Sequence, residues 1–196
     1  AINQSLINAS SVADQTYRKL LYGPVSAMYY PSIGSLETVG NLTINDIQNM
    51  YQFINSAMAS VAVTGDVSAE KIATSLSFLK RLRKGTEWIL DPIVPAEITK
   101  TKIYFVDKKN AAQSEIRMGY LALPYDAYAT YYKCNVMNFP FAGAFNSRVN
   151  YELREVKGWT YGTRAGFSGS KFMGAYTLSG GFKANATDSS LSEILK

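Results

Sequence analysis

Histidine is absent from the 196 residues, and cysteine occurs once, at Cys134. Without histidine, the chain can hold neither a His-ligated zinc ion nor a Ser-His-Asp triad nor a Cys-His dyad. One cysteine excludes an internal disulfide and a Cys-x-x-Cys metal site. The sequence also lacks the run of about 18 apolar residues that a membrane helix needs. Chemistry of these kinds would therefore need another chain, or a part of the protein outside this sequence.

The charge is modestly positive and spread along the chain, with 20 Lys and Arg against 15 Asp and Glu, or +5. The densest basic run, from Lys80 to Lys84, falls at the end of an expected helix, where positive charge complements the helix dipole. No aromatic and basic RNA-binding motif accompanies this run, so we expect no nucleic-acid partner. A hydrophobic fraction of 47% and a charged fraction of 18% are typical of a folded domain.

Helices dominate the expected first half. Apolar spacing predicts helices over residues 3–21, 44–55 and 68–83. Thr43 is a good cap for the second of these helices, with Asp46 three residues later, where an acid meets free N–H groups. The short apolar run at residues 59–64 predicts a buried strand between the second and third helices.

Residues 84–100 contain glycine and proline and read as a linker, with a possible sub-boundary near 85–100. The second half alternates between the two element types. Strands are expected at 102–107, 113–122, 159–168 and 172–183, and helices at 127–139, at 145–156 and from Thr187 or Asp188 to the chain end. This order predicts an α+β fold, in which helices pack on one face of a mostly antiparallel sheet. We expect residues 1–196 to form a single-domain fragment, truncated at both ends because each end falls within or beside a helix.

Few side chains are candidates for chemistry. Glu152 and Glu155 are three residues apart and share a helix face, where we expect them to meet solvent or to pair with Arg148 and Lys157. Cys134 lies mid-helix and is expected to be a small buried apolar residue. The sequence therefore predicts no metal ligand and no cofactor-binding residue in this chain.

A more informative pair is Arg154 and Tyr161. Arg154 lies near a helix end, Gly158 can adopt the left-handed conformation that closes the helix, and Tyr161 follows at the start of a strand. A helix end that runs into a strand can bring the two side chains together. Arginine offers forked donors and tyrosine one hydroxyl, which suits a peptide carbonyl or an oxyanion. Alternatively, Arg154 pairs with a local acid and Tyr161 fills a pleat; the spacing leaves both interpretations open.

The stretch FNSRVNYELREVKGWTYGTRAGF, with AAQSEIRMGY before it and GAYTLSGGFKANATD after it, resembles the C-terminal half of the pitrilysin/insulinase zinc metallopeptidases. That family includes the mitochondrial processing peptidases. Upstream, YRKLLYGPVSAMYYPSIGSLETVGNLTINDIQNMYQFI and ASVAVTGDV add to the resemblance, which covers roughly residues 15–190. One departure is Tyr29-Tyr30-Pro31, where the family has a His-Pro-Tyr-like stretch that is not catalytic.

The resemblance implies a role. Family members pair homologous α+β metallohydrolase domains into two halves that clamp an unfolded peptide. One half carries zinc in an inverted His-x-x-Glu-His motif. The other half lacks zinc and supplies an Arg and a Tyr that bind substrate and support the transition state; these match Arg154 and Tyr161. The missing histidine is what a zinc-free half should show.

The expected partners are thus a zinc-bearing homologous domain or subunit and an extended peptide. Zinc in the complete enzyme is expected on a different domain or chain, and the fragment alone should be inactive. The alternative is a structural paralogue, since relatives serve as scaffold subunits in respiratory complexes without proteolysis. The expected location is a bacterial periplasm or cell envelope, although nothing within these residues shows a compartment.

Overall fold

The computed structural model describes residues 1–88 and 98–196. Residues 89–97, which hold much of the predicted linker, lie outside the described residues. The chain divides into two units, of which one combines Ala1–Ser35 with Pro92–Lys196 and the other is Leu36–Asp91. The first unit contains all the described strands and the candidate site.

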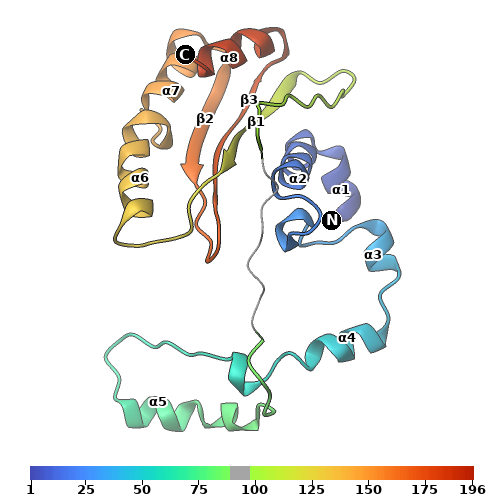
Figure 1. Ribbon diagram of the computed structural model, residues 1–196, viewed down its shortest axis with the longest axis vertical. Helices are drawn as coiled ribbons and strands as arrows, with labels where there is room; N and C mark the ends of the chain where they lie inside the picture. The colour runs from blue at the N-terminus through green and yellow to red at the C-terminus, as the bar shows by residue number, and fades with distance from the viewer. Residues whose placement is uncertain (89–97) are drawn as a thin grey trace. The chain divides into compact units, whose positions relative to one another are not determined.

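An antiparallel sheet of three strands forms the centre of the first unit (Figure 1). The strands are β1 (Gln113–Leu121), β2 (Thr160–Phe167) and β3 (Ala175–Lys183), in the order β1-β3-β2. Leu178 on β3 lies opposite Met118 on β1 and Ala165 on β2. The predicted strands at 113–122, 159–168 and 172–183 are therefore confirmed, with ends shifted by up to three residues.

Helices from the second half of the chain cover one face of this sheet (Figure 1). They are α6 (Thr130–Asn138), α7 (Arg148–Tyr151) and α8 (Thr187–Ile194), with π-helical turns at Phe139–Gly143 and Glu152–Val156 and a 3₁₀ turn at Ala184–Ala186. Phe182 and Leu153, both almost fully buried, pack with Ile116 on this face. The α+β fold with an antiparallel sheet is confirmed, because alternate residues of each strand meet these helices.

The opposite face is partly covered by α2 (Ala9–Tyr22). Leu21 and Tyr22 pack there against Ala175, and the predicted helix over 3–21 is present. It is divided at Asn8, whose side chain accepts a hydrogen bond from Ser11 N and begins α2 after the short α1 (Ile2–Ile7). A 3₁₀ turn at Ala27–Tyr29 follows.

A buried arginine ties α2 to β1. The side chain of Arg117 is 8% exposed and pairs with Asp14 on α2 and with Glu115 on its own strand, at 2.5 and 3.1 Å. Arg117 also donates to the Ser10 hydroxyl. Burial lowers the pKa of Arg117, and the bonds to Asp14 and Glu115 outweigh that effect, so the net pKa is raised. Arg117 therefore remains positively charged, and its ion pair with Asp14 holds α2 on the sheet.

Tyr17, on α2, gives this packing a dependence on alkaline pH. Its hydroxyl lies 3.1 Å from the Thr177 hydroxyl, and burial raises the pKa of Tyr17 above 10.0 despite that bond. Because the pKa of Tyr17 is raised in the folded state, its contribution to stability is fully present below about pH 10 and is lost as pH rises through the folded pKa.

We expect the free energy of unfolding to fall less in Tyr17→Phe than in wild type between about pH 9 and about pH 11. Urea unfolding at both pH values checks this prediction. Tyr128→Phe, at a 94% exposed tyrosine, should keep the wild-type pH dependence; equal losses in Tyr17→Phe and wild type would contradict the account.

The second unit contains α3 (Leu36–Gly40), α4 (Ile44–Tyr51) and α5 (Ala69–Ser75), with 3₁₀ turns at Ser56–Met58 and Ser77–Arg81. The predicted cap of α4 is confirmed. Thr43 Oγ1 accepts from Asp46 N, and the Asp46 carboxylate accepts from Thr43 N. The bonds from Thr43 lower the pKa of Asp46.

Within the described chain, no helix is both long and apolar enough to cross a membrane.

Two predicted strands are wrong. Residues 59–64 and 102–107 belong to no strand, and their apolar side chains are exposed, among them Val61 at 55% and Ile103 at 85%. The apolar runs indicated burial, but a strand forms only where a neighbour completes its hydrogen bonds. No described strand pairs with either segment.

Candidate functional site

The link between the second π-helical turn and β2 determines where the site begins. Trp159 N donates to Leu153 O at 3.0 Å, and Lys157 N donates to Glu152 O at 2.9 Å. These bonds close the helical segment while Gly158, at φ 64°, turns the chain toward the sheet. The prediction that Gly158 adopts the left-handed conformation is confirmed by this φ. Glycine suits the position because a side chain would be strained there.

A β-bulge follows at once and projects Tyr161 outward. Thr160 lies opposite Phe182 and Thr163 opposite Gly180, so β2 has one residue more than β3 over this interval. The hydroxyl of Thr160 fills the gap in the ladder, since it donates to Gly181 O at 2.7 Å and accepts from Gly162 N at 3.0 Å. Tyr161 is left 87% exposed.

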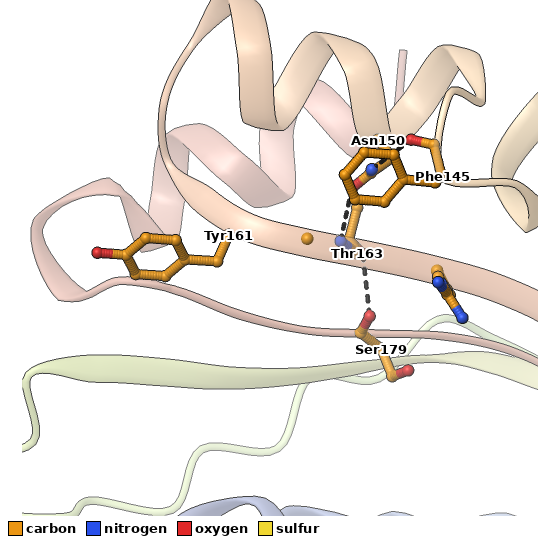
Figure 2. A pocket seen from close by; sticks show the side chains of 7 residues that line it. Phe145, Asn150, Tyr161, Thr163 and Ser179 are labelled. Carbon is orange, nitrogen blue, oxygen red and sulfur yellow. Dashed lines mark hydrogen bonds between the residues drawn. The ribbon is translucent and has the colours of Figure 1, made fainter.

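Asn150 holds the bulge against the helical layer. Its side chain is almost fully buried on α7. The amide nitrogen donates to Phe145 O at 2.6 Å, and the amide oxygen accepts from Thr163 N at 2.7 Å (Figure 2). Thr163 in turn donates its hydroxyl to Ser179 O at 3.0 Å. Asn150 therefore fixes the Phe145 loop and β2 in one geometry.

These elements surround a cavity of about 330 Å³. Figure 2 shows Phe145 and Asn150 over Thr163, with Tyr161 further along β2 and Ser179 on the neighbouring strand. The residues that line the cavity are Phe145, Asn150, Tyr161, Gly162, Thr163, Arg164 and Ser179. The cavity thus combines an aromatic wall with hydroxyl and guanidinium donors.

Arg154 lies against the aromatic wall of this cavity. Its guanidinium carbon is 4.3 Å from the centre of the Phe145 ring, and Nη1 is 2.8 Å from Glu155 Oε1. The Arg154 side chain is 32% exposed. The alternative interpretation holds in part, because Arg154 does pair with a local acid but Tyr161 does not fill a pleat. The joint action of Arg154 and Tyr161 on a peptide stays a prediction.

The free edge of β2 is covered by polar side chains from the helical layer. Asn138 Nδ2 donates to Ala165 O at 2.8 Å, and the Tyr131 hydroxyl donates to Phe167 O at 3.0 Å. With the Asn150 bond to Thr163 N, these contacts occupy three backbone groups of β2. Such side chains prevent another strand from pairing with the edge.

Other predicted candidates stand outside the cavity. Glu152 pairs with Lys157 at 3.5 Å, as predicted, whereas Glu155 pairs with Arg154 and not with Arg148. Cys134 is half-buried, not fully buried as predicted. In residues 1–88 and 98–196, no group of three or more Asp, Glu, Cys or His side chains could hold a metal ion.

Of the residues that line the cavity, the sequence interpretation named only Tyr161 and missed Phe145, Asn150, Gly162, Thr163, Arg164 and Ser179. One feature of the sequence could have pointed to Asn150, because it is a polar residue between Val149 and Leu153 on the apolar helix face. Phe145 and Arg164 carried no signal of their own, because their role depends on the loop and the strand meeting at one cavity.

The model of the peptidase M16 inactive domain family matches residues 41–196. A crystal structure of a peptidase M16 inactive domain from Pseudomonas fluorescens is 22% identical, with a TM-score of 0.81, and the match covers 97% of this chain and 46% of that one. No curated protein matches.

Two further solved structures share the fold at lower identity. A protease from Helicobacter pylori is 14% identical with a TM-score of 0.62, over 100% of this chain and 52% of that one. A chain of complex III2 from Candida albicans, with Inz-5 bound, is 13% identical with a TM-score of 0.64, over 93% of this chain and 44% of that one. This chain spans about half the length of the solved chains it matches.

Proposed function

The chain belongs to the family of peptidase M16 inactive domains, and on that premise we propose that it is the substrate-binding, non-catalytic half of a zinc endopeptidase. Its partner is a homologous domain or subunit that carries the zinc ion, and its ligand is an extended peptide. The residues of this chain do not suit a zinc site, because histidine is absent and the described residues hold no cluster of metal ligands. The zinc ion of the complete enzyme would therefore be held by the partner.

One observation carries the proposal. Tyr161 extends into solvent from a bulge, and it lines the same cavity as the Phe145 ring on which Arg154 stacks. A large side chain that is 87% exposed on a strand contributes little to the fold. Its hydroxyl has no partner within the described chain, so it is free to donate to a ligand.

Arg154 and Tyr161 would act on a peptide carbonyl. Arg154 has five N–H donors, and only Nη1 contacts Glu155. The contact with the Phe145 ring limits the movement of the guanidinium, which lowers the entropy lost on binding. When a carbonyl oxygen gains negative charge during cleavage, hydrogen bonds from a fixed guanidinium and a hydroxyl strengthen. The peptide would be held by these side-chain donors, since polar side chains already cover the free edge of β2.

Metal analysis and a peptidase assay test whether zinc binding and cleavage belong to the partner and not to this chain. We expect this chain, purified alone, to bind no stoichiometric zinc and to cleave no unstructured peptide, whereas the complete protein does both. Stoichiometric zinc on the isolated chain, with a Kd below about 1 μM, would contradict the proposal.

A second candidate function is a structural subunit without proteolytic activity. The similarity to a chain of complex III2 from Candida albicans is the observation in its favour. A complete, zinc-loaded protein that cleaves no peptide would support this candidate over the first.

A further inference from the structure

The cavity contains a cation with no counter-ion. Arg164 is exposed on β2 and lines the cavity. Across residues 1–88 and 98–196, no carboxylate pairs with its guanidinium, in contrast to Arg154 and Arg117. No Asp or Glu is among the residues that line the cavity. The charge of Arg164 is therefore available to a ligand.

A second donor lies beside it. Arg164 is directly opposite Ser179 on β3, so the two side chains leave the sheet on the same face. Within the described part of the chain, the Ser179 hydroxyl has no hydrogen-bond partner, although the Ser179 carbonyl accepts from Thr163. The next residue in this row is Arg117 on β1, which already binds both carboxylates of its surroundings, Asp14 and Glu115.

The remaining polar groups of the cavity do not compete for a ligand. The Asn150 amide is occupied by Phe145 O and Thr163 N. Arg164 and Ser179 contribute a guanidinium and a hydroxyl on the α2 face of the sheet, and Tyr161 and Phe145 complete the lining of the cavity. The one charged side chain among the lining residues is Arg164, and it is positive. A guanidinium with hydroxyl donors beside it is the usual chemistry by which proteins recognise a carboxylate.

We propose that this cavity is a subsite for a carboxylate of the bound peptide, with Arg164 as the principal ligand and Ser179 as a second donor. The proposal rests on the proposed peptide-binding function and adds a substrate class to it. The carboxylate can belong to an Asp or Glu side chain or to the C-terminus of the peptide, because both present the same two oxygens.

A peptide series with the complete protein tests the subsite. One neutral, labelled sequence is varied by changing one Gln at a time to Glu, each with a free or an amidated C-terminus. Binding is followed by fluorescence anisotropy immediately after mixing, and kcat/KM is measured in parallel. The variants are Arg164→Gln and, as a matched loss of one exposed positive charge outside the cavity, Arg148→Gln.

In wild type, we expect one carboxylate to strengthen binding about tenfold relative to the neutral peptide. Arg164→Gln should reduce this ratio to within about twofold of unity, while Arg148→Gln should keep it. A preference that survives amidation identifies a side-chain carboxylate, and one that amidation removes identifies the C-terminus. A wild-type ratio near one, or an unchanged ratio in Arg164→Gln, would overturn the proposal.

The outcomes separate this proposal from the function on which it rests. If peptides are cleaved and Tyr161 matters but charge has no effect, the subsite alone is wrong. If the carboxylate preference in binding is present but no peptide is cleaved, the peptidase role is wrong and the subsite stands. If no peptide of the series binds, both are wrong.

Discussion

Replacing Gly119 by alanine is expected to lower the free energy of unfolding by about 3 kcal/mol. Gly119 lies on β1 where α2 crosses the sheet. A Cβ atom there would overlap the Tyr176 carbonyl oxygen and the Tyr17 hydroxyl, and would touch Thr177 Cα. The carbonyl and Cα are backbone atoms that cannot rotate away, so the strands or α2 must shift. A shift of α2 would also break the bond between Tyr17 and Thr177.

Gly166 provides the matched control for this substitution. It lies on β2 of the same sheet, and a Cβ atom added there would have nothing within 4 Å. Gly166→Ala should therefore be neutral or should stabilise by up to about 1 kcal/mol, because alanine restricts the unfolded chain. Urea unfolding of both variants measures the difference. Equal midpoints would contradict the close approach of the β3 backbone and of Tyr17 to Gly119.

Elements with local signals could be predicted from the sequence. The cap formed by Thr43 and Asp46 is a contact between residues three apart, and the alternation of residues 113–122 is visible without any partner. The segments 59–64 and 102–107 carry equally strong apolar patterns, but they form no strand. Strand formation depends on a neighbour from elsewhere in the chain, and the pattern of a single segment does not contain that information.

The candidate site, too, could be predicted from the sequence only in part. Arg154, Gly158 and Tyr161 lie within eight residues of each other, so the helix end and the strand start could be located from their spacing. The extra residue in β2 could not, because a bulge is defined by the register against β3. The stacking of Arg154 on Phe145 depends on the Asn150 bonds that hold the loop, and these contacts are tertiary.

The largest effect on activity is expected from Tyr161→Phe. Removal of one hydrogen-bond donor to a developing oxyanion costs about 10²- to 10³-fold in rate. Because the Tyr161 side chain is 87% exposed and its hydroxyl is unbonded within the described chain, the variant should keep the wild-type Tm. Tyr128→Phe removes a hydroxyl from a tyrosine that is 94% exposed and outside the cavity, so it should leave kcat/KM unchanged.

The most direct test of the pair is kcat/KM of the complete, zinc-loaded protein for one unstructured peptide, compared among wild type, Tyr161→Phe, Arg154→Lys and the double variant. Lysine keeps the charge of Arg154 but loses the planar fork. If both side chains act on one peptide group, each single variant should be slow, and the double variant should be about as slow as the slower single variant. Wild-type kcat/KM in Tyr161→Phe and Arg154→Lys, at wild-type Tm, would contradict the account.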